Sequence, residues 1–353
     1  MIRTILARLV FVLLVIPGVA SAGGFSWTFQ NTSISNNGSS VALGMRGGDV
    51  WPVIFSPEDS VALLPTGWAS VGDGLVQNPP LAASSPTGEV AAWSGRAADP
   101  RLAVVSSPSG WQTCEADTVT FDDQGRLWRA NDGRVSYLDA GGWNYLPDLP
   151  GETSSKIALA VSGEEVGVVT VMNGLFYYHY SPLVGSWEQS PNLLSGGTTI
   201  GNKPSLVFDD NAVPHILGVA SDRAVAYDFC VQTGQWQSTN LPGTSDLSVP
   251  LPLDHDGAGT VGTAYVSGES LYYAYNTDNT TWMVTTIPAG ADGSSEPQDF
   301  GVGLAYDYEG LPVVAYTGDN NVMWLAYDPI IVPEPLTAAL LAVGGLCAPR
   351  RRR

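Results

Sequence analysis

Carboxylates are the side chains of this sequence most able to do chemistry, and arginines accompany them at a few places. The chain has 34 Asp and Glu residues, 15 Lys and Arg residues and only 3 His residues. One set of carboxylates falls in short polar segments between strand-like runs, where hairpin loops are expected. Gathered on one face, these loops could bind a cation or the hydroxyls of a sugar. The competing interpretation is that hairpin loops are polar because they meet water. The set comprises Asp59, Asp99, Asp132, Asp222, Glu269 and Asp319, with Arg96, Arg134 and Arg223 beside them.

A second set of carboxylates recurs in turns that directly follow a hydrophobic strand. Hard oxygen ligands suit calcium, so these turns are candidate calcium ligands. Yet no single turn holds enough acids for a complete calcium site, and Asp commonly caps its own turn while Gly takes positive φ. We therefore expect turn chemistry here, and neither a resident metal nor another cofactor. The set comprises Asp122, Asp123, Asp209, Asp210, Asp254, Asp256 and Asp307.

Signatures of known catalytic sites are sparse. The three histidines, His179, His215 and His255, form neither an H-E-x-x-H motif nor a metal pair. There is no G-x-S-x-G elbow and no phosphate-cradling glycine loop. Glycoside hydrolysis needs only two carboxylates at a suitable separation, and sequence spacing identifies no such pair. A binding role is therefore favoured, with an acid-dependent hydrolase or lyase as the alternative.

The elements that would position these side chains form a repeat. Each clear unit has a hydrophobic strand, an Asp-containing turn, two further strand-like runs, a second turn and a tryptophan. A period of about 45 residues with about four strands is typical of a β-propeller blade. Long helices are disfavoured by 40 Gly, 25 Pro and runs of period two. The tryptophans that mark the register are Trp68, Trp111, Trp143, Trp187, Trp236 and Trp282.

The number of third strands predicts seven four-stranded blades. They lie near Val61, Leu102, Val135, Leu175, Val225, Leu271 and Val322. The last unit lacks a following tryptophan, whereas 25–29 is a strand-like run with a tryptophan and no preceding blade. We predict that this N-terminal run is the outer strand of the last blade, which would close the ring without a free edge. Six blades with irregular N-terminal strands, or a pair of β-sandwiches, are the alternatives.

This architecture predicts where the loops and the aromatic rings should lie. Loops between second and third strands share a face with the connections between blades, so the first set of acids should surround one mouth of a central channel. Tryptophan and tyrosine can stack on sugars, but one tryptophan per blade suits packing between blades, because each buries a large area. The tryptophans outside the register could be exposed, although they too lie in strand-like runs; they are Trp51, Trp93, Trp128 and Trp324.

The N-terminus has the pattern of a secretory signal peptide over residues 1–22. Arg3 and Arg8 precede and flank an apolar run, and Ala20 and Ala22 are small residues at the positions read by signal peptidase. The apolar run is too short to span a bilayer, which favours cleavage after Ala22. A buried N-terminal strand is the alternative.

The C-terminus, residues 331–353, has three parts in a fixed order. A rigid Val-Pro-Glu-Pro segment is followed by an uncharged apolar run over 336–348 and then by an arginine cluster. These features are Pro333, Glu334 and Pro335, then Arg350, Arg351, Arg352 and Arg353. About 13 apolar residues make a helix of about 20 Å, so the flanking residues must extend it across a core of about 30 Å.

This ordered tail resembles the PEP-CTERM sorting domain, and the resemblance covers roughly the last 22 residues. It implies recognition by an exosortase, transient insertion of a transmembrane helix, cleavage near the Pro-Glu-Pro motif, and release or attachment at the cell surface. Such proteins usually belong to bacteria that make exopolysaccharide. A plain C-terminal membrane anchor is the alternative. The middle region, 23–330, is similar only to bacterial β-propellers in general.

Charge and cysteine content further limit the partners. One acid and six arginines lie in the two ends, which leaves 33 acids and 9 bases in the middle region. Nucleic-acid binding is disfavoured because no basic stripe could replace phosphate counterions. Cys347 lies in the tail, and we expect Cys114 and Cys230 to be free thiols, although a single disulfide between them is conceivable in an oxidising compartment. The sequence thus predicts an exported propeller that binds extracellular polysaccharide or an envelope protein.

Overall fold

The computed structural model describes residues 25–327 except for 26, 36–40, 47–50, 56–58, 65–66, 74–80, 88, 94–101, 108–109, 152–155, 172–173, 194–203, 220–222, 242–243, 245–250, 279–280, 291–294, 299–300 and 308. Within that part the chain forms 28 β-strands and no helix. The predicted signal peptide and sorting tail lie outside the described residues, so nothing in the structure bears on them. This applies to Ala20, Ala22, Pro333, Glu334, Pro335, Arg350, Arg351, Arg352 and Arg353.

The strands form seven antiparallel four-stranded sheets in the described part of the chain. Sheet one contains β2 (Ala42–Arg46), β3 (Trp51–Phe55), β4 (Asp59–Leu64) and β5 (Gly67–Asp73). Sheet two contains β6 (Leu81–Ser84), β7 (Val90–Trp93), β8 (Leu102–Ser107) and β9 (Gly110–Glu115). Sheet three contains β10 (Thr118–Phe121), β11 (Leu127–Asn131), β12 (Arg134–Asp139) and β13 (Gly142–Tyr145).

The remaining sheets repeat this order. Sheet four contains β14 (Ile157–Ser162), β15 (Glu165–Val171), β16 (Leu175–Ser181) and β17 (Ser186–Gln189). Sheet five contains β18 (Ser205–Phe208), β19 (Pro214–Val219), β20 (Ala224–Cys230) and β21 (Gln235–Asn240). Sheet six contains β22 (Asp254–His255), β23 (Val261–Ser267), β24 (Ser270–Asn276) and β25 (Trp282–Ile287). Sheet seven contains β26 (Gly303–Tyr306), β27 (Pro312–Thr317), β28 (Val322–Tyr327) and β1 (Thr28–Ser35).

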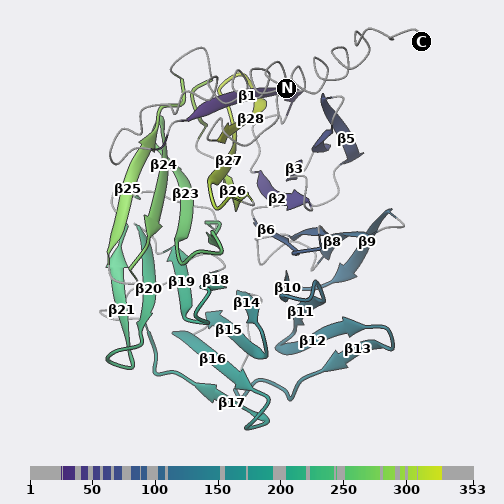
Figure 1. The fold of residues 1–353 in the computed structure, drawn as a ribbon, viewed down its shortest axis with the longest axis vertical. Coiled ribbons are helices and arrows are strands. Elements are labelled where there is room, and N and C mark those ends of the chain that lie inside the picture. The colour runs from purple at the N-terminus through teal and green to yellow at the C-terminus, as the bar shows by residue number, and fades with distance from the viewer. Residues whose placement is uncertain are drawn as a thin grey trace, which may run out of the picture.

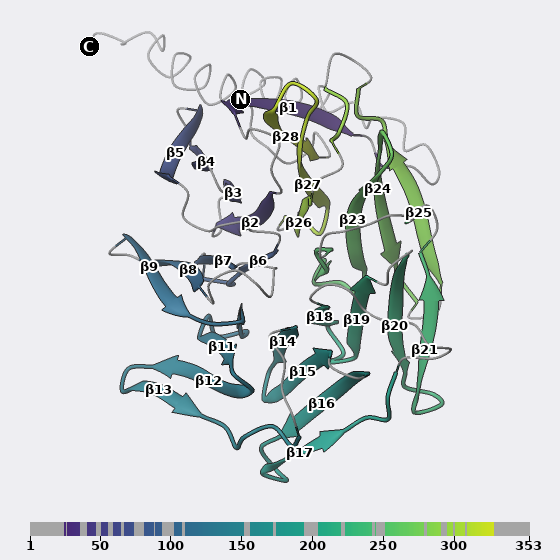
Figure 2. The same ribbon diagram turned by 180° about the vertical axis from the view of Figure 1, so that it is seen from behind.

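The sheets are arranged around a common centre, as two opposite views show (Figures 1 and 2). The first strand of each sheet contacts the first strand of the next, from β2 through β6, β10, β14, β18 and β22 to β26, and β26 contacts β2. The fold is therefore all-β and propeller-like. Each predicted third strand is present, as β4, β8, β12, β16, β20, β24 and β28.

The core lies between neighbouring sheets. One cluster joins Tyr177 of sheet four to Ile216 and Tyr227 of sheet five, and equivalent clusters lie at other junctions. Second strands such as β19 and β27 are buried at every residue, whereas the fourth strand β21 is largely exposed. Strands covered on both faces read as continuous hydrophobic runs, because every side chain leaves water.

The register tryptophans lie where the repeat predicts them. All six are on the fourth strand of a sheet, β5, β9, β13, β17, β21 or β25. Trp93, Trp128 and Trp324 are buried, so the suggestion that the tryptophans outside the register are exposed is wrong for these three. They lie on inner strands that face a neighbouring sheet. The side chain of Trp51 lies outside the described residues.

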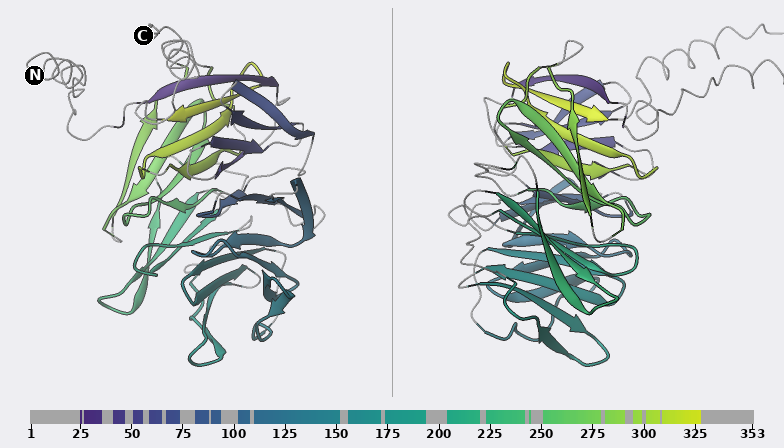
Figure 3. Two further views of the ribbon diagram at one scale, coloured as in Figure 1. Left: turned by 45° about the vertical axis from the view of Figure 1, so that its right-hand side comes forward. Right: turned by 90° about the vertical axis from the view of Figure 1, so that its left-hand side faces the viewer.

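The N-terminal strand completes the last sheet. β1 pairs with β28 in antiparallel register, with Thr28 opposite Tyr327 and Phe29 opposite Ala326; the purple β1 lies beside the yellow strands of sheet seven (Figure 3). Just before β1, the ring of Phe25 contacts Tyr273 and Tyr275 of sheet six, with centroids 5.2 and 5.4 Å away. The predicted pairing of the N-terminal run with the last unit is therefore observed, and the run also packs on sheet six.

Candidate binding surfaces

The recurring turn acids cap their own turns. In Asp122, Oδ1 accepts hydrogen bonds from the backbone N–H groups of Gln124 (3.0 Å) and Arg126 (2.9 Å). Asp209, Asp256 and Asp307 each do the same with the residues two and four positions later, at 2.7–3.0 Å. The expected role in the turn is therefore observed for these four carboxylates, each of which accepts backbone N–H groups of its own turn. Among the described residues, no group of three or more His, Cys, Asp or Glu side chains could hold a metal ion.

Two members of this set have different roles from the capping acids. Asp254 is not a turn residue: it lies in β22, and Asp256 occupies the position equivalent to Asp122. In the sequence the two are separated by one residue, so the repeat alone did not distinguish them. Asp123 links two turns, because its Oδ2 accepts the N–H of Gly163 in sheet four at 2.8 Å.

The environments of the turn acids move their pKa values in opposite directions. Burial alone would raise the pKa of Asp122, but hydrogen bonds from Trp128 (2.9 Å) and Arg126 (2.6 Å) to Oδ2 hold it below the ordinary value. Burial raises the pKa of Asp307, whose Oδ2 is buried without a hydrogen-bond partner among the described residues. The same turn position therefore carries a stabilised carboxylate in one sheet and a destabilised one in another.

The loop acids proposed from the sequence are only partly described. Asp132, Glu269 and Asp319 lie in the hairpins after the second strands of sheets three, six and seven, as predicted. The N–H of Asp132 donates to Oδ2 of Asp117 at 3.1 Å, and Oδ1 of Asp319 accepts a hydrogen bond from Ser295. Asp99, Asp222 and Arg96 are not described, and only the backbone of Asp59 is. The convergence of these acids around one mouth stays a prediction.

The arginines of that set occupy separate places. Arg134 lies with Asp132 in one surface hollow, together with Arg129 and Tyr145. Its Nε is 3.4 Å from Oδ1 of Asp148, and both side chains are exposed, so this ion pair adds little stability. Arg223 lies directly before β20 in sheet five. Neither arginine lines the central cavity described next.

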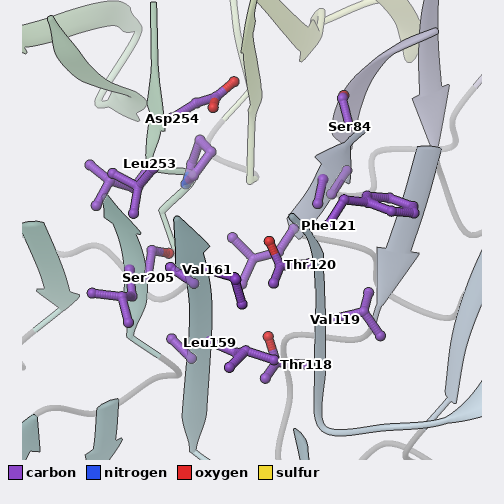
Figure 4. A pocket seen from close by; sticks show the side chains of 18 of the residues that line it. Ser84, Thr118, Val119, Thr120, Phe121, Leu159, Val161, Ser205, Leu253 and Asp254 are labelled. Atoms are coloured by element: carbon purple, nitrogen blue, oxygen red, sulfur yellow. The ribbon is translucent and has the colours of Figure 1, made fainter. Parts of the chain in front are cut away.

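A cavity of about 190 Å³ runs along the first strands of the sheets (Figure 4). All seven sheets contribute to its lining, through residues such as Leu43, Ser84, Thr118, Ala158, Ser205, Asp254 and Leu304. Burial raises the pKa of Asp254, whose Oδ2 accepts the N–H of Tyr306 in the next sheet at 3.3 Å. Ser205 donates to the carbonyl of Leu251. Asp132, Glu269 and Asp319 are absent from the lining.

A buried network around His215 joins sheets five and six. Its Nδ1 lies 2.7 Å from Oδ1 of Asp228, and its Nε2 lies 3.7 Å from Oδ2 of Asp209. Trp282 of sheet six donates from Nε1 to the other oxygen of Asp228 at 2.9 Å. Burial would lower the pKa of His215, but the hydrogen bond to Asp228 and the negative charges of Asp228 and Asp209 raise it above the ordinary value. The side chain of His215 is fully buried, so its role is to hold sheets five and six together and not to contact a ligand.

The two cysteines of the middle region are free. Cys114 lies on β9 in sheet two, and Cys230 lies on β20 in sheet five. This confirms the expectation of two free thiols. Burial raises the pKa of Cys114, which disfavours its reactive thiolate form.

Comparisons with known proteins give the fold and nothing more. No protein-family model and no curated protein matches the chain. A chain in the solved structure titled "Crystal Structure of Mitotic Checkpoint Complex" superposes with a TM-score of 0.57 at 9% identity, covering 87% of this chain and 94% of that one. The described part of the chain has no helix that is long and apolar enough to cross a membrane.

Proposed function

We propose that this chain is an exported protein, sorted to the cell surface by an exosortase, in which a closed seven-bladed propeller binds extracellular polysaccharide or an envelope protein. The signal-like residues 1–22 and the ordered tail 331–353 support the export route. On this proposal signal peptidase and exosortase are transient partners, and membrane insertion through the tail is temporary.

The observation that carries the binding role is that all seven sheets line one cavity. Contact of β26 with β2 and pairing of β1 with β28 support a closed ring. A closed ring presents the hairpin loops of every blade around one axis, and such rigidly supported loops are where binding residues concentrate. The rival function, a polysaccharide hydrolase or lyase, requires two carboxylates held at about 5–10 Å across a cleft.

The described turn acids are poorly placed to serve as the acid or base of a hydrolase. In Asp122, Asp209 and Asp256, Oδ1 accepts two backbone N–H groups, which orients each carboxylate into its own turn. A general acid needs instead a carboxyl group aimed at substrate and a raised pKa. Asp307 and Asp254 have raised pKa values, but backbone N–H groups also orient them.

A two-part experiment tests this function. The first part follows the tagged full-length chain, and a variant with Pro333 and Pro335 changed to Ala, through cell fractionation in a host with and without an exosortase. We expect tail processing and surface delivery only with the intact motif and the exosortase. The second part incubates the purified protein with a panel of envelope polysaccharides and measures both binding and release of reducing ends. Binding without release is expected; cleavage that is lost in Asp132→Asn or Asp319→Asn would establish the enzyme instead.

A further inference from the structure

A groove of about 410 Å³ lies between sheets four and five, and of its lining residues only Phe208 also lines the central cavity. It is lined by side chains of β16, β17, β20 and β21, together with the turn that joins β18 to β19. None of the loop acids or arginines singled out in the sequence lines it. We call it the aromatic groove, because Tyr177, Phe229 and Trp236 form much of its walls.

Sheet four supplies one wall of the aromatic groove. Tyr177 and His179 are two positions apart on β16, so they share a face, and their rings are nearly parallel with centroids 6.4 Å apart. The carboxylate of Glu165 accepts a hydrogen bond from Nε2 of His179, which orients the ring. Glu188 lies directly opposite His179 in the register of β16 with β17, and its side chain is exposed.

Sheet five supplies the other wall. Phe229 and Trp236 are directly opposite each other on β20 and β21, with ring centroids 5.5 Å apart. Trp236 also meets the edge of Tyr177 across the junction, at 5.2 Å and an interplanar angle of 65°. Both Trp236 and Phe229 are half-buried, so each packs on its neighbours and still presents a surface to the groove.

Trp236 differs from two other register tryptophans in what its indole N–H does. Trp187 donates to the carbonyl of Pro147, in the segment after sheet three, at 2.7 Å, and Trp282 donates to Asp228 in sheet five at 2.9 Å. The indole N–H of Trp236 donates to no acceptor among the described residues, and the nitrogen is not fully buried by them. It therefore remains available to an incoming acceptor.

Polar side chains stand beside these rings. Glu188, Gln189 and Asn211 are exposed and line the groove. A carboxylate accepts hydrogen bonds from hydroxyl groups, and side-chain amides both donate and accept, so together they match the mixed donor–acceptor character of a hydroxyl group. Flat aromatic faces next to such groups form an amphipathic surface that fits a sugar ring, which has apolar C–H faces and a polar hydroxyl edge.

We propose that the aromatic groove binds a neutral saccharide, with a sugar ring packed on Trp236 and its hydroxyls bonded to Glu188 and Asn211. This rests on the proposed function and names its site and ligand class. A polyanion is disfavoured, because Glu188 lines the groove, Glu165 lies behind His179, and the chain carries a net charge of −19. The groove volume falls within the range of about 300–1,000 Å³ typical of small-ligand sites.

The test titrates the full-length protein with a soluble neutral glucan and with a polyuronate of matched chain length, by calorimetry and affinity electrophoresis. Trp236→Ala should weaken glucan binding by at least about tenfold, the loss of roughly one good aromatic contact. Glu188→Gln and Asn211→Ala change exposed groups and should each weaken it by about threefold to tenfold, the range of one hydrogen bond. Leu183→Ala, which removes an exposed apolar side chain from the turn after β16, outside the groove lining, is the control and should bind like the wild type.

The outcomes separate the site from the function. Glucan binding that is unchanged in all three groove variants would overturn the site while leaving the proposed function standing. Preference for the polyuronate, or tighter binding in Glu188→Gln, would overturn the neutral ligand class. Displacement of the glucan by a proline-rich peptide that binds more tightly would assign the groove to protein recognition. Failure of the wild type to bind any polysaccharide or envelope protein would overturn the proposed function itself. Because Trp236→Ala also removes packing contacts, the thermal unfolding of this variant is measured as well. If the Trp236→Ala variant is unfolded, Glu188→Gln and Asn211→Ala decide the outcome.

Discussion

Replacing Asp228 with alanine should destabilise the protein strongly and in a pH-dependent way. The change leaves two buried donors without an acceptor, Nδ1 of His215 and Nε1 of Trp282. An orphaned buried donor costs about 1–3 kcal/mol, and removing one member of a buried charged pair costs about 3–5 kcal/mol. We expect a loss of about 4 kcal/mol at about pH 5.5, which corresponds to a fall in Tm of about 6 °C for a folded region of about 300 residues.

The sign of the pH dependence follows from the raised pKa of His215 in the folded protein. Protonated His215 between Asp209 and Asp228 stabilises the native state fully below the ordinary histidine pKa of about 6.5. That contribution is lost as the pH rises through the folded pKa. The cost of Asp228→Ala should therefore be largest at about pH 5.5 and smaller at about pH 9.

Urea unfolding of the wild type and variants at both pH values measures these differences. Asp228→Asn is the matched variant, because it keeps an oxygen for Trp282 while removing the charge; we expect a loss of about 2 kcal/mol with little dependence on pH. Asp148→Asn, at an exposed carboxylate, should be nearly neutral. A cost for Asp228→Ala below about 1 kcal/mol, or one equal at both pH values, would refute the reasoning.

Three further predictions concern single turns and the tail. Ala212 has a φ of 57° at a turn position where sheet three has Gly125 with a φ of 76°. Because positive φ strains a residue with a side chain, Ala212→Gly should stabilise the protein by about 0.5 kcal/mol and Gly125→Ala should destabilise it by about 1–2 kcal/mol. Urea unfolding measures both changes, and the opposite signs would contradict the strain argument. Because the pKa of Asp122 is lowered, its contribution to folding stability is present above the ordinary Asp pKa of about 3.9 and is lost as the pH falls through the folded value. Asp122→Asn should therefore lower the free energy of unfolding at neutral pH and lose less stability than the wild type on acidification. An equal loss of stability on acidification in wild type and variant would count against this. A chain ending at Ile330 should melt like the longer mature chain, because β1 pairs with β28 without the tail, and calorimetry showing a large drop in Tm would disprove this.

Several features could be predicted from the sequence because they depend on short-range chemistry. A period-two strand, an aspartate that caps its own turn and a tryptophan after a turn are specified within a few residues, so the repeat located the third strands and the register of Trp143, Trp187 and Trp282. Where the local pattern was ambiguous, the prediction was too. Asp254 directly follows the hydrophobic Leu253 and Asp256 lies two residues later, and only the backbone hydrogen bonds show that Asp256 caps the turn.

The candidate sites were harder to predict, since they form between segments distant in sequence. The acids selected from the loops share a position in the repeat, but nothing in their spacing shows which side chains meet. Trp236 was expected to pack between blades, and it does contact Tyr177; that it also lines a groove with Glu188 depends on the neighbouring sheet. Asn211 lies in a turn next to the same groove, and nothing in the residues around Asn211 in the sequence indicates this.

The sequence by itself determined the repeat, the all-β character and the turn chemistry of residues such as Asp122, because these follow from the conformational preferences of neighbouring residues. It also contained the N-terminal strand of the last sheet, whose partner strand, about 300 residues later, was inferred from a missing tryptophan. Only the tertiary structure decided that His215 is fully buried between Asp209 and Asp228, with Trp282 of the next sheet bound to the same carboxylate. The same is true of the aromatic groove, because burial and electrostatic environment depend on which sheets pack side by side.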